Sequence, residues 1–293
     1  MRCFDRLNPI VSFVYFVLVL IISMLSLNPI IIGICYVASL IFYGLLKGFK
    51  ELLKSLIYST TMLLMIALTN PLFVHKGETI LFFLNNNPVT KESICYGFCA
   101  ATMIVSVYYW FSCYSEIMSS DKFIYLFGRV TPKLSLLLSM ALGFIPKLKR
   151  KYKEIDEAQK GLGIYSSQSY VDKIRSKFRV LSILLTNSLE NSIDTADSMR
   201  CRGYGLKGRT SYEIYRFTLS DLIYLIFILV VAIANIVFII LGYAQFSFYP
   251  TITFNETIHM SVILYVLLVL LVGSSIFMEV KENILWRYLK SKI

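Results

Sequence analysis

Residues 7–46 read LNPIVSFVYFVLVLIISMLSLNPIIIGICYVASLIFYGLL and contain no charged side chain. As one α-helix this stretch would be about 60 Å long, twice the roughly 30 Å hydrocarbon thickness of a bilayer. Asn28-Pro29 divides the stretch near its middle, because proline has no amide hydrogen and biases the preceding residue away from helix. The stretch therefore predicts a helical hairpin, with one membrane span over 9–27 and a second over 29–46.

The composition of the whole chain agrees with a membrane protein. Hydrophobic residues make up 57% of the 293 residues and charged residues 16%, whereas soluble domains are about 45–50% apolar and about 25% charged. Further apolar stretches over 55–69, 94–114, 222–242 and 258–278 are each close to the length of a spanning helix. We therefore predict an all-α polytopic membrane protein with about six transmembrane helices, in which Asp221 is interfacial and solvated.

The basic residues indicate the orientation of these spans. With six spans, 27 of the 29 Lys and Arg residues fall on one side, and only Lys76 and Lys91 on the other. Because cytoplasmic loops carry an excess of Lys and Arg, both termini are predicted to be cytoplasmic in a multi-pass protein of the plasma membrane. The same rule, with attraction to anionic lipid headgroups, accounts for most of the net charge of +11. A nucleic-acid partner is not predicted, because the basic segment reads as long helices rather than as a groove with aromatic platforms.

The chain is predicted to have three parts. Residues 1–115 form an N-terminal transmembrane region of four spans, 116–217 a cytoplasmic region, and 218–293 a C-terminal transmembrane region of two spans. Within the cytoplasmic region we predict two long helices, over 133–160 and 171–201. The second carries an apolar stripe at spacings of three and four, which predicts packing against the first helix; its members are Ile174, Phe178, Leu181, Leu185, Leu189, Ile193, Ala196 and Met199.

Both long helices are followed by glycine, the commonest residue just past a helix end. The first ends in Glu157-Ala158-Gln159-Lys160-Gly161-Leu162-Gly163, and the second in the run 196–210, ADSMRCRGYGLKGRT. This second run closely resembles the signature of the transmembrane T component of energy-coupling factor (ECF) transporters, the CbiQ/EcfT family. The resemblance extends over about residues 1–220. It includes Asn8-Pro9, Asn28-Pro29, Asn70-Pro71-Leu72-Phe73, residues 81–83 and 88–93, Ser119-Ser120-Asp121-Lys122-Phe123 and Leu138-Ser139-Met140.

The resemblance implies a transport scaffold that hydrolyses no ATP itself. In that family the ends of two cytoplasmic coupling helices dock into two ABC-type ATPase subunits, while the membrane part holds a small substrate-binding S component. By position, the docking motifs here are Gly161-Leu162-Gly163 and Cys201-Arg202-Gly203, the latter preceded by Arg200. Leu162 stands where the family has arginine, so the first motif would rely on apolar contact or on Lys160. The implied function is coupling of ATP hydrolysis to uptake of a vitamin or transition-metal ion.

The sequence contains few residues that would indicate catalysis or metal binding. The chain has no G-x-x-x-x-G-K-[ST] phosphate-binding loop and only two histidines, His75 and His259, so we predict no enzymatic activity and no cofactor. Cys95 and Cys99 lie four residues apart, but nothing brings them to the histidines, and no metal site is predicted. Two alternatives stay open. One is a membrane-embedded enzyme of lipid metabolism that uses the basic cytosolic segment to bind headgroup phosphates. Such an enzyme needs a cluster of Asp or His at the membrane surface, and the residues nearest to such a cluster are Glu190, Asp194 and Asp197, without a histidine. The other is a secondary transporter, which the uncharged spans disfavour.

Overall fold

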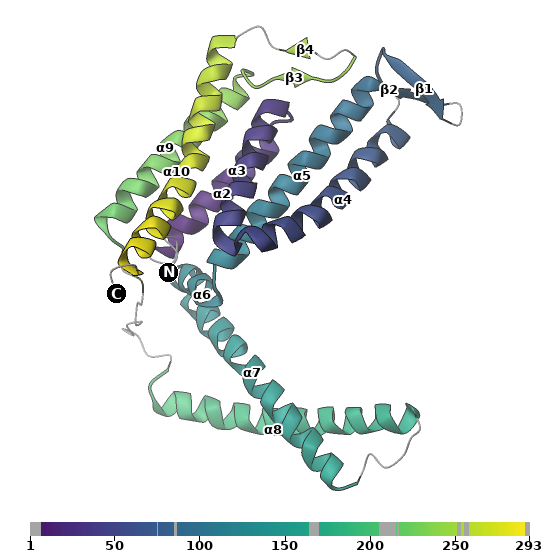
Figure 1. The fold of residues 1–293 in the computed structure, drawn as a ribbon. Helices are drawn as coiled ribbons and strands as arrows, with labels where there is room; N and C mark the ends of the chain where they lie inside the picture. The colour runs from purple at the N-terminus through teal and green to yellow at the C-terminus, as the bar shows by residue number, and fades with distance from the viewer. Residues whose placement is uncertain are drawn as a thin grey trace. The chain divides into compact units, whose positions relative to one another are not determined.

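The computed structural model describes residues 7–74, 76–84, 87–163, 170–204, 215, 217–250, 253–254 and 258–290. Within them the chain forms nine helices and two short hairpins, which confirms the all-α prediction. The helices are α2 (Pro9–Leu25), α3 (Pro29–Lys47), α4 (Phe49–Phe73), α5 (Lys91–Ile117), α6 (Ser120–Val130), α7 (Pro132–Gly161), α8 (Tyr170–Cys201), α9 (Leu219–Ile240) and α10 (Ile258–Lys290). The hairpins pair β1 (Ile80–Leu84) with β2 (Asn87–Thr90), and β3 (Phe246–Ser247) with β4 (Thr253–Phe254), both antiparallel (Figure 1).

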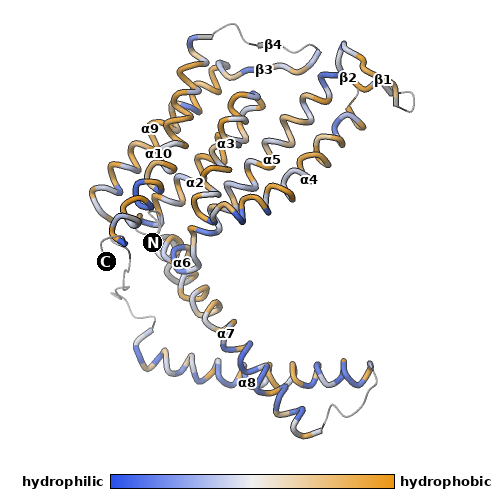
Figure 2. Tube along the Cα trace, viewed as in Figure 1, coloured by the Kyte–Doolittle hydropathy of each residue, from blue (hydrophilic) through white to orange (hydrophobic). Residues whose placement is uncertain are grey.

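The chain divides into two compact units. One consists of Met1–Ser120 together with Tyr215–Ile293, and the other of Asp121–Ile214. The first unit holds α2 to α5, α9 and α10, which are apolar along most of their length (Figure 2). The second unit holds α7, α8 and nearly all of α6. The division into two transmembrane regions, 1–115 and 218–293, and a cytoplasmic region, 116–217, stays a prediction.

The helices of the first unit have the dimensions of membrane spans. Five of them, α3, α4, α5, α9 and α10, are long and apolar enough to cross a bilayer, and α2 is an apolar helix of 17 residues. Each of the six predicted spans therefore falls on a helix of the first unit. The first span is shorter than predicted, because α2 ends at Leu25 and Ser26 has an extended backbone. The third is longer, since α4 continues through Pro71 to Phe73.

The two Asn-Pro pairs explain how the uncharged stretch is divided. The side chains of Asn8 and Asn28 accept hydrogen bonds from the backbone N–H groups of Ile10 and Ile30, at 3.1 and 3.0 Å. Each asparagine is thus the N-cap of the helix that follows, and proline occupies the first helical position, where an amide hydrogen has no partner within the helix. Asn28 also donates to the hydroxyl of Tyr265 on α10, at 3.2 Å. Each cap therefore fixes where its helix begins, and Asn28 also holds the start of α3 next to α10.

An aromatic cluster forms much of the core of the first unit. Trp110 on α5 is fully buried and stacks on Phe42 of α3, with ring centroids 5.7 Å apart. Trp110 also packs against Phe16 of α2 in a T-shaped arrangement, with ring centroids 6.2 Å apart. Tyr109, on the same helix, donates to Ser59 of α4 at 2.8 Å. Helix α5 is therefore the central helix of the unit, in contact with α2, α3 and α4.

Asp221 is buried, with 3% of its surface exposed, so the prediction of a solvated side chain is wrong. One carboxylate oxygen accepts from the Thr218 backbone N–H at 3.0 Å and from the Thr218 hydroxyl at 2.7 Å. The other accepts from the backbone N–H of Asn8 at 3.3 Å. The carboxylate therefore caps α9 and at the same time ties the start of α2 to the start of α9.

Replacing Asp221 with alanine should destabilise the chain by about 2 kcal/mol, because it removes a capping box and the hydrogen bond to the backbone N–H of the buried Asn8. Thermal unfolding of the purified protein in mild detergent, followed by the reactivity of its buried cysteines, measures the effect. Asp194→Ala, which removes an exposed carboxylate, is the control and should leave the melting temperature unchanged. Equal melting temperatures for the two variants would contradict this role of Asp221.

Candidate coupling surface at the ends of two long helices

Helices α7 and α8 are the longest elements of the second unit, with 30 and 32 residues. They begin and end within one residue of the predicted ranges. The helices pack against each other and cross (Figure 1). Pro146 lies inside α7 without ending it. The backbone hydrogen bonds of such long helices make them stiff, so a displacement at one end is carried along the helix.

The apolar stripe of α8 does not pack on α7 as predicted. The residues that α8 buries are Ser176, Val180 and Leu184, one turn apart on another face of the helix. These buried side chains are small or medium in size, whereas most members of the stripe are large and apolar. The stripe is left exposed by 43–67% along most of its length, at Ile174, Phe178, Leu181, Leu185, Leu189 and Ile193. Only its last members, Ala196 and Met199, contribute to a pocket shared with α7.

The first predicted motif lies at the C-terminal end of α7. The helix ends at Gly161, and the backbone N–H of Leu162 donates to the carbonyl of Ala158 at 3.1 Å. Gly163 follows with a φ of 73°, and its N–H donates to the carbonyl of Lys160 at 3.0 Å. This left-handed conformation is one that glycine adopts without a steric penalty. The chain thus turns sharply at Gly163, and the side chain of Leu162 is 76% exposed at the turn.

The second predicted motif lies at the C-terminal end of α8 and has the same geometry. Gly203 has a φ of 77°, and its N–H donates to the carbonyl of Arg200 at 2.9 Å. The N–H of Tyr204 donates to the carbonyl of Met199 at 3.0 Å, which completes a Schellman motif. Cys201 and Arg202 are both exposed at this end. Residues 205–210 of the signature lie outside the described residues.

The two helix ends therefore present one exposed side chain each at the same position, immediately before a left-handed glycine. At α8 that side chain is Arg202, which makes no ion pair with the described residues of the unit, whereas Arg200 lies 3.9 Å from Asp197. At α7 it is Leu162, and the nearby Lys160 lies 2.6 Å from Asp156. This hydrogen bond raises the pKa of the Lys160 ammonium group. Because Lys160 is already held by Asp156, the first motif offers mainly an apolar contact and the second a cation.

Other candidate ligands do not form a site in the described part of the chain. Cys95 and Cys99 lie on α5 and His259 in the first turn of α10, while His75 is outside the described residues. Among the residues that the structure describes, no three His, Cys, Asp or Glu side chains are grouped to hold a metal ion. Glu190, Asp194 and Asp197 lie exposed along α8.

Two features of this surface were missed by the sequence analysis. One is the exposure of the stripe, and the other is the pocket that Met140 and Phe144 of α7 form with α8. The four-residue spacing of Met140 and Phe144 places both on one face of α7 and is a signal that a sequence analysis can detect.

The chain is similar in sequence to several known proteins that share one name. A protein from Listeria innocua named energy-coupling factor transporter transmembrane protein EcfT is 28% identical over 174 residues, which cover 54% of this chain and 64% of the relative. Proteins of the same name from Lactobacillus helveticus and Staphylococcus aureus are 34% and 35% identical, over 34% of this chain and 38% of their own length. The chain thus spans less than two thirds of these relatives.

The family comparison covers a longer part of the chain. The CbiQ family model, described as cobalt transport protein, matches residues 2–212. This range includes α2 to α5 as well as the long helices α7 and α8 with the motifs at their C-terminal ends. The resemblance found in the sequence is therefore confirmed, and the chain, a polytopic membrane protein, belongs to the CbiQ family.

Proposed function

We propose that this chain is the transmembrane T component of an ECF-type ABC importer. It would couple ATP hydrolysis by two ABC-type ATPase subunits to uptake of a micronutrient, a vitamin or a transition-metal ion, through an S component. The observation that carries the proposal is the matched geometry of the two helix ends. Leu162 and Arg202 each stand exposed before a left-handed glycine, at the ends of two stiff helices that pack together.

This geometry suits the docking of two similar subunits. Each helix end projects one exposed side chain at a sharp turn. Arg202 offers a planar fork of donors, which matches carboxylates and backbone carbonyls. Leu162 offers a shorter, apolar tip. When ATP closes the ATPase pair, the helix ends would move with the subunits, and α7 and α8 would carry that movement.

The exposed apolar stripe of α8 supports the proposal that the chain binds an S component. Six large apolar side chains on one helix face, from Ile174 to Ile193, are exposed in the described structure. Contiguous exposed apolar surface of this kind marks an interaction site. We propose that it contacts the S component, a small hydrophobic membrane protein that would bring the substrate site. The chain itself would then be a scaffold and no enzyme, in the plasma membrane with both termini in the cytoplasm.

Co-purification from membranes of the native host tests this function. A tagged chain, extracted in mild detergent, should bring down two ATPase subunits and a small membrane protein, identified by mass spectrometry. The complex should hydrolyse ATP, and the chain purified after a stringent detergent wash should not. Recovery of the chain alone, with substrate uptake by liposomes that contain no ATPase, would contradict the proposal.

A further inference from the structure

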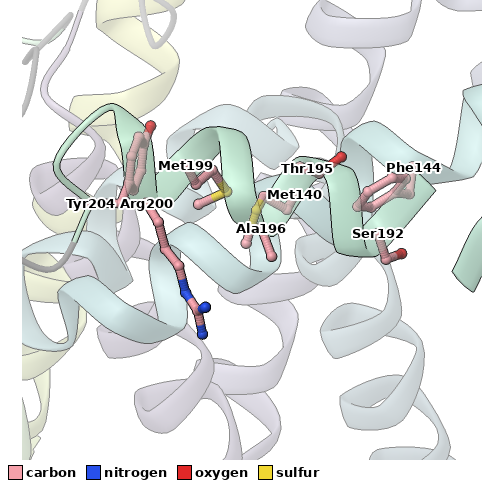
Figure 3. A pocket seen from close by; sticks show the side chains of 8 residues that line it. All are labelled: Met140, Phe144, Ser192, Thr195, Ala196, Met199, Arg200 and Tyr204. Carbon is pink, nitrogen blue, oxygen red and sulfur yellow. The ribbon is translucent and has the colours of Figure 1, made fainter. Parts of the chain in front are cut away.

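A pocket of about 390 Å³ opens between α7 and α8, beside the second helix end. Figure 3 shows Met199 and Ala196 of α8 beside Met140 of α7, with Phe144 next to Ser192. The volume is at the low end of the range for small-ligand pockets, about 300–1,000 Å³. It therefore fits one or two apolar side chains of a partner.

The lining of this pocket is almost entirely apolar. The hydroxyls of Ser192 and Thr195 donate to carbonyls of their own helix, those of Ser188 and Asn191, both at 2.6 Å. Those hydroxyl hydrogens are therefore not available to a ligand. Met140 and Met199 have flexible, polarizable side chains that adapt to the shape of an apolar group. The pocket suits a hydrophobic side chain rather than a polar metabolite.

The C-cap of α8 joins this pocket to Arg202. The N–H of Tyr204 bonds the carbonyl of Met199, so the Schellman motif that places Arg202 at the turn also brings Tyr204 against the pocket. Hydrophobic contact between these two positions is common in the motif. A partner residue in the pocket would therefore lie next to Arg202.

The charged residues around the pocket indicate which group of the partner would lie beside its apolar side chain. Arg200 lies at its edge, with its guanidinium extending away from the methionines (Figure 3). Because an α-helix turns about 100° per residue, Glu190, Asp194 and Asp197 lie on the opposite face of α8. The mouth of the pocket is thus bordered by one cation, Arg200, which also lies 3.9 Å from Asp197. A complementary partner presents a carboxylate on this side.

We infer that this pocket receives an apolar side chain, flanked by a carboxylate, from the docking surface of an ABC-type ATPase subunit. The inference rests on the proposed function and adds a second contact to the one at Arg202. Arg202 binds the carboxylate, and the pocket buries the neighbouring apolar group. Central, fully desolvated side chains of this kind supply most of the energy of an interface, with a polar rim around them.

Filling the pocket tests the inference. Thr195→Phe places a ring in the pocket, while Thr186→Phe adds the same ring at an exposed site of the same helix. The two threonines are matched, since each hydroxyl bonds a carbonyl four residues earlier. In the tagged full chain co-purified with its ATPases, Thr195→Phe should lower ATPase retention at least about tenfold, and Thr186→Phe should not. Size-exclusion profiles of both variants check that they fold.

A photo-reactive benzoylphenylalanine at position 195 identifies the occupant directly. The expected cross-link is to an apolar residue of an ATPase subunit with Asp or Glu beside it. A cross-link to the S component, or equal ATPase retention by Thr195→Phe and Thr186→Phe, would overturn the inference while the proposed function stands. If the unmodified chain retains no ATPase, the proposed function itself fails, and the inference fails with it.

Discussion

Replacing Arg202 with glutamate is expected to abolish ATP-driven uptake while the chain still inserts into the membrane in normal amounts. Arg202 is exposed at the turn after α8, where a partner reaches its guanidinium without moving the helix. Glutamate places a negative charge against the partner's carboxylate, and also against the negative end of the helix dipole. Removal of one member of a desolvated charge pair costs about 2–5 kcal/mol, so ATPase affinity should fall at least about thirtyfold.

The measurements are ATPase retention during purification and substrate uptake by whole cells. Arg179→Glu is the matched control, because Arg179 is an exposed arginine of the same helix, near its crossing with α7 rather than at its end. Both variants should reach the membrane in equal amounts, which an immunoblot of membrane fractions checks. An Arg202→Glu chain that still captures ATPases and supports uptake would refute the docking role of this residue.

The hydrophobic pattern of the sequence predicts most of the fold. The caps at Asn8 and Asn28 are local, since each side chain bonds an amide two residues away, and the sequence alone therefore locates the helix starts. Asp221 is different, because its burial depends on the backbone of Asn8, 213 residues away. A prediction from the local pattern placed it in solvent for that reason.

The ends of α7 and α8 were also predictable from the local sequence, but the packing between the two helices was not. Glycines 163 and 203 are recognisable as helix ends from the sequence, and both have the left-handed conformation. The face of α8 that meets α7 was not predictable, because an apolar stripe indicates only that some partner covers it. The buried residues of α8 are Ser176, Val180 and Leu184 instead. The stripe stays exposed in the described structure.

Leu185→Glu is expected to weaken binding of the S component and to leave binding of the ATPase subunits unchanged. Leu185 lies in the middle of the exposed stripe of α8, between Leu181 and Leu189, and is itself 56% exposed. A carboxylate there would be buried without a partner if the S component covers the stripe, which is strongly unfavourable. Retention of the small membrane protein should therefore fall at least about tenfold, which corresponds to about 1.4 kcal/mol.

The control is Thr186→Glu, which adds the same charge at the next residue, an exposed position off the stripe. ATPase retention should stay unchanged in both variants, because position 185 lies four helical turns before the end at Cys201. Arg202→Glu should give the opposite result, with the S component kept and the ATPases lost. If Leu185→Glu keeps the S component at the unmodified ratio, the stripe is not its binding surface. Loss of both partners in that variant would instead mean that α8 acts as a single docking element, and the separation proposed here would be wrong.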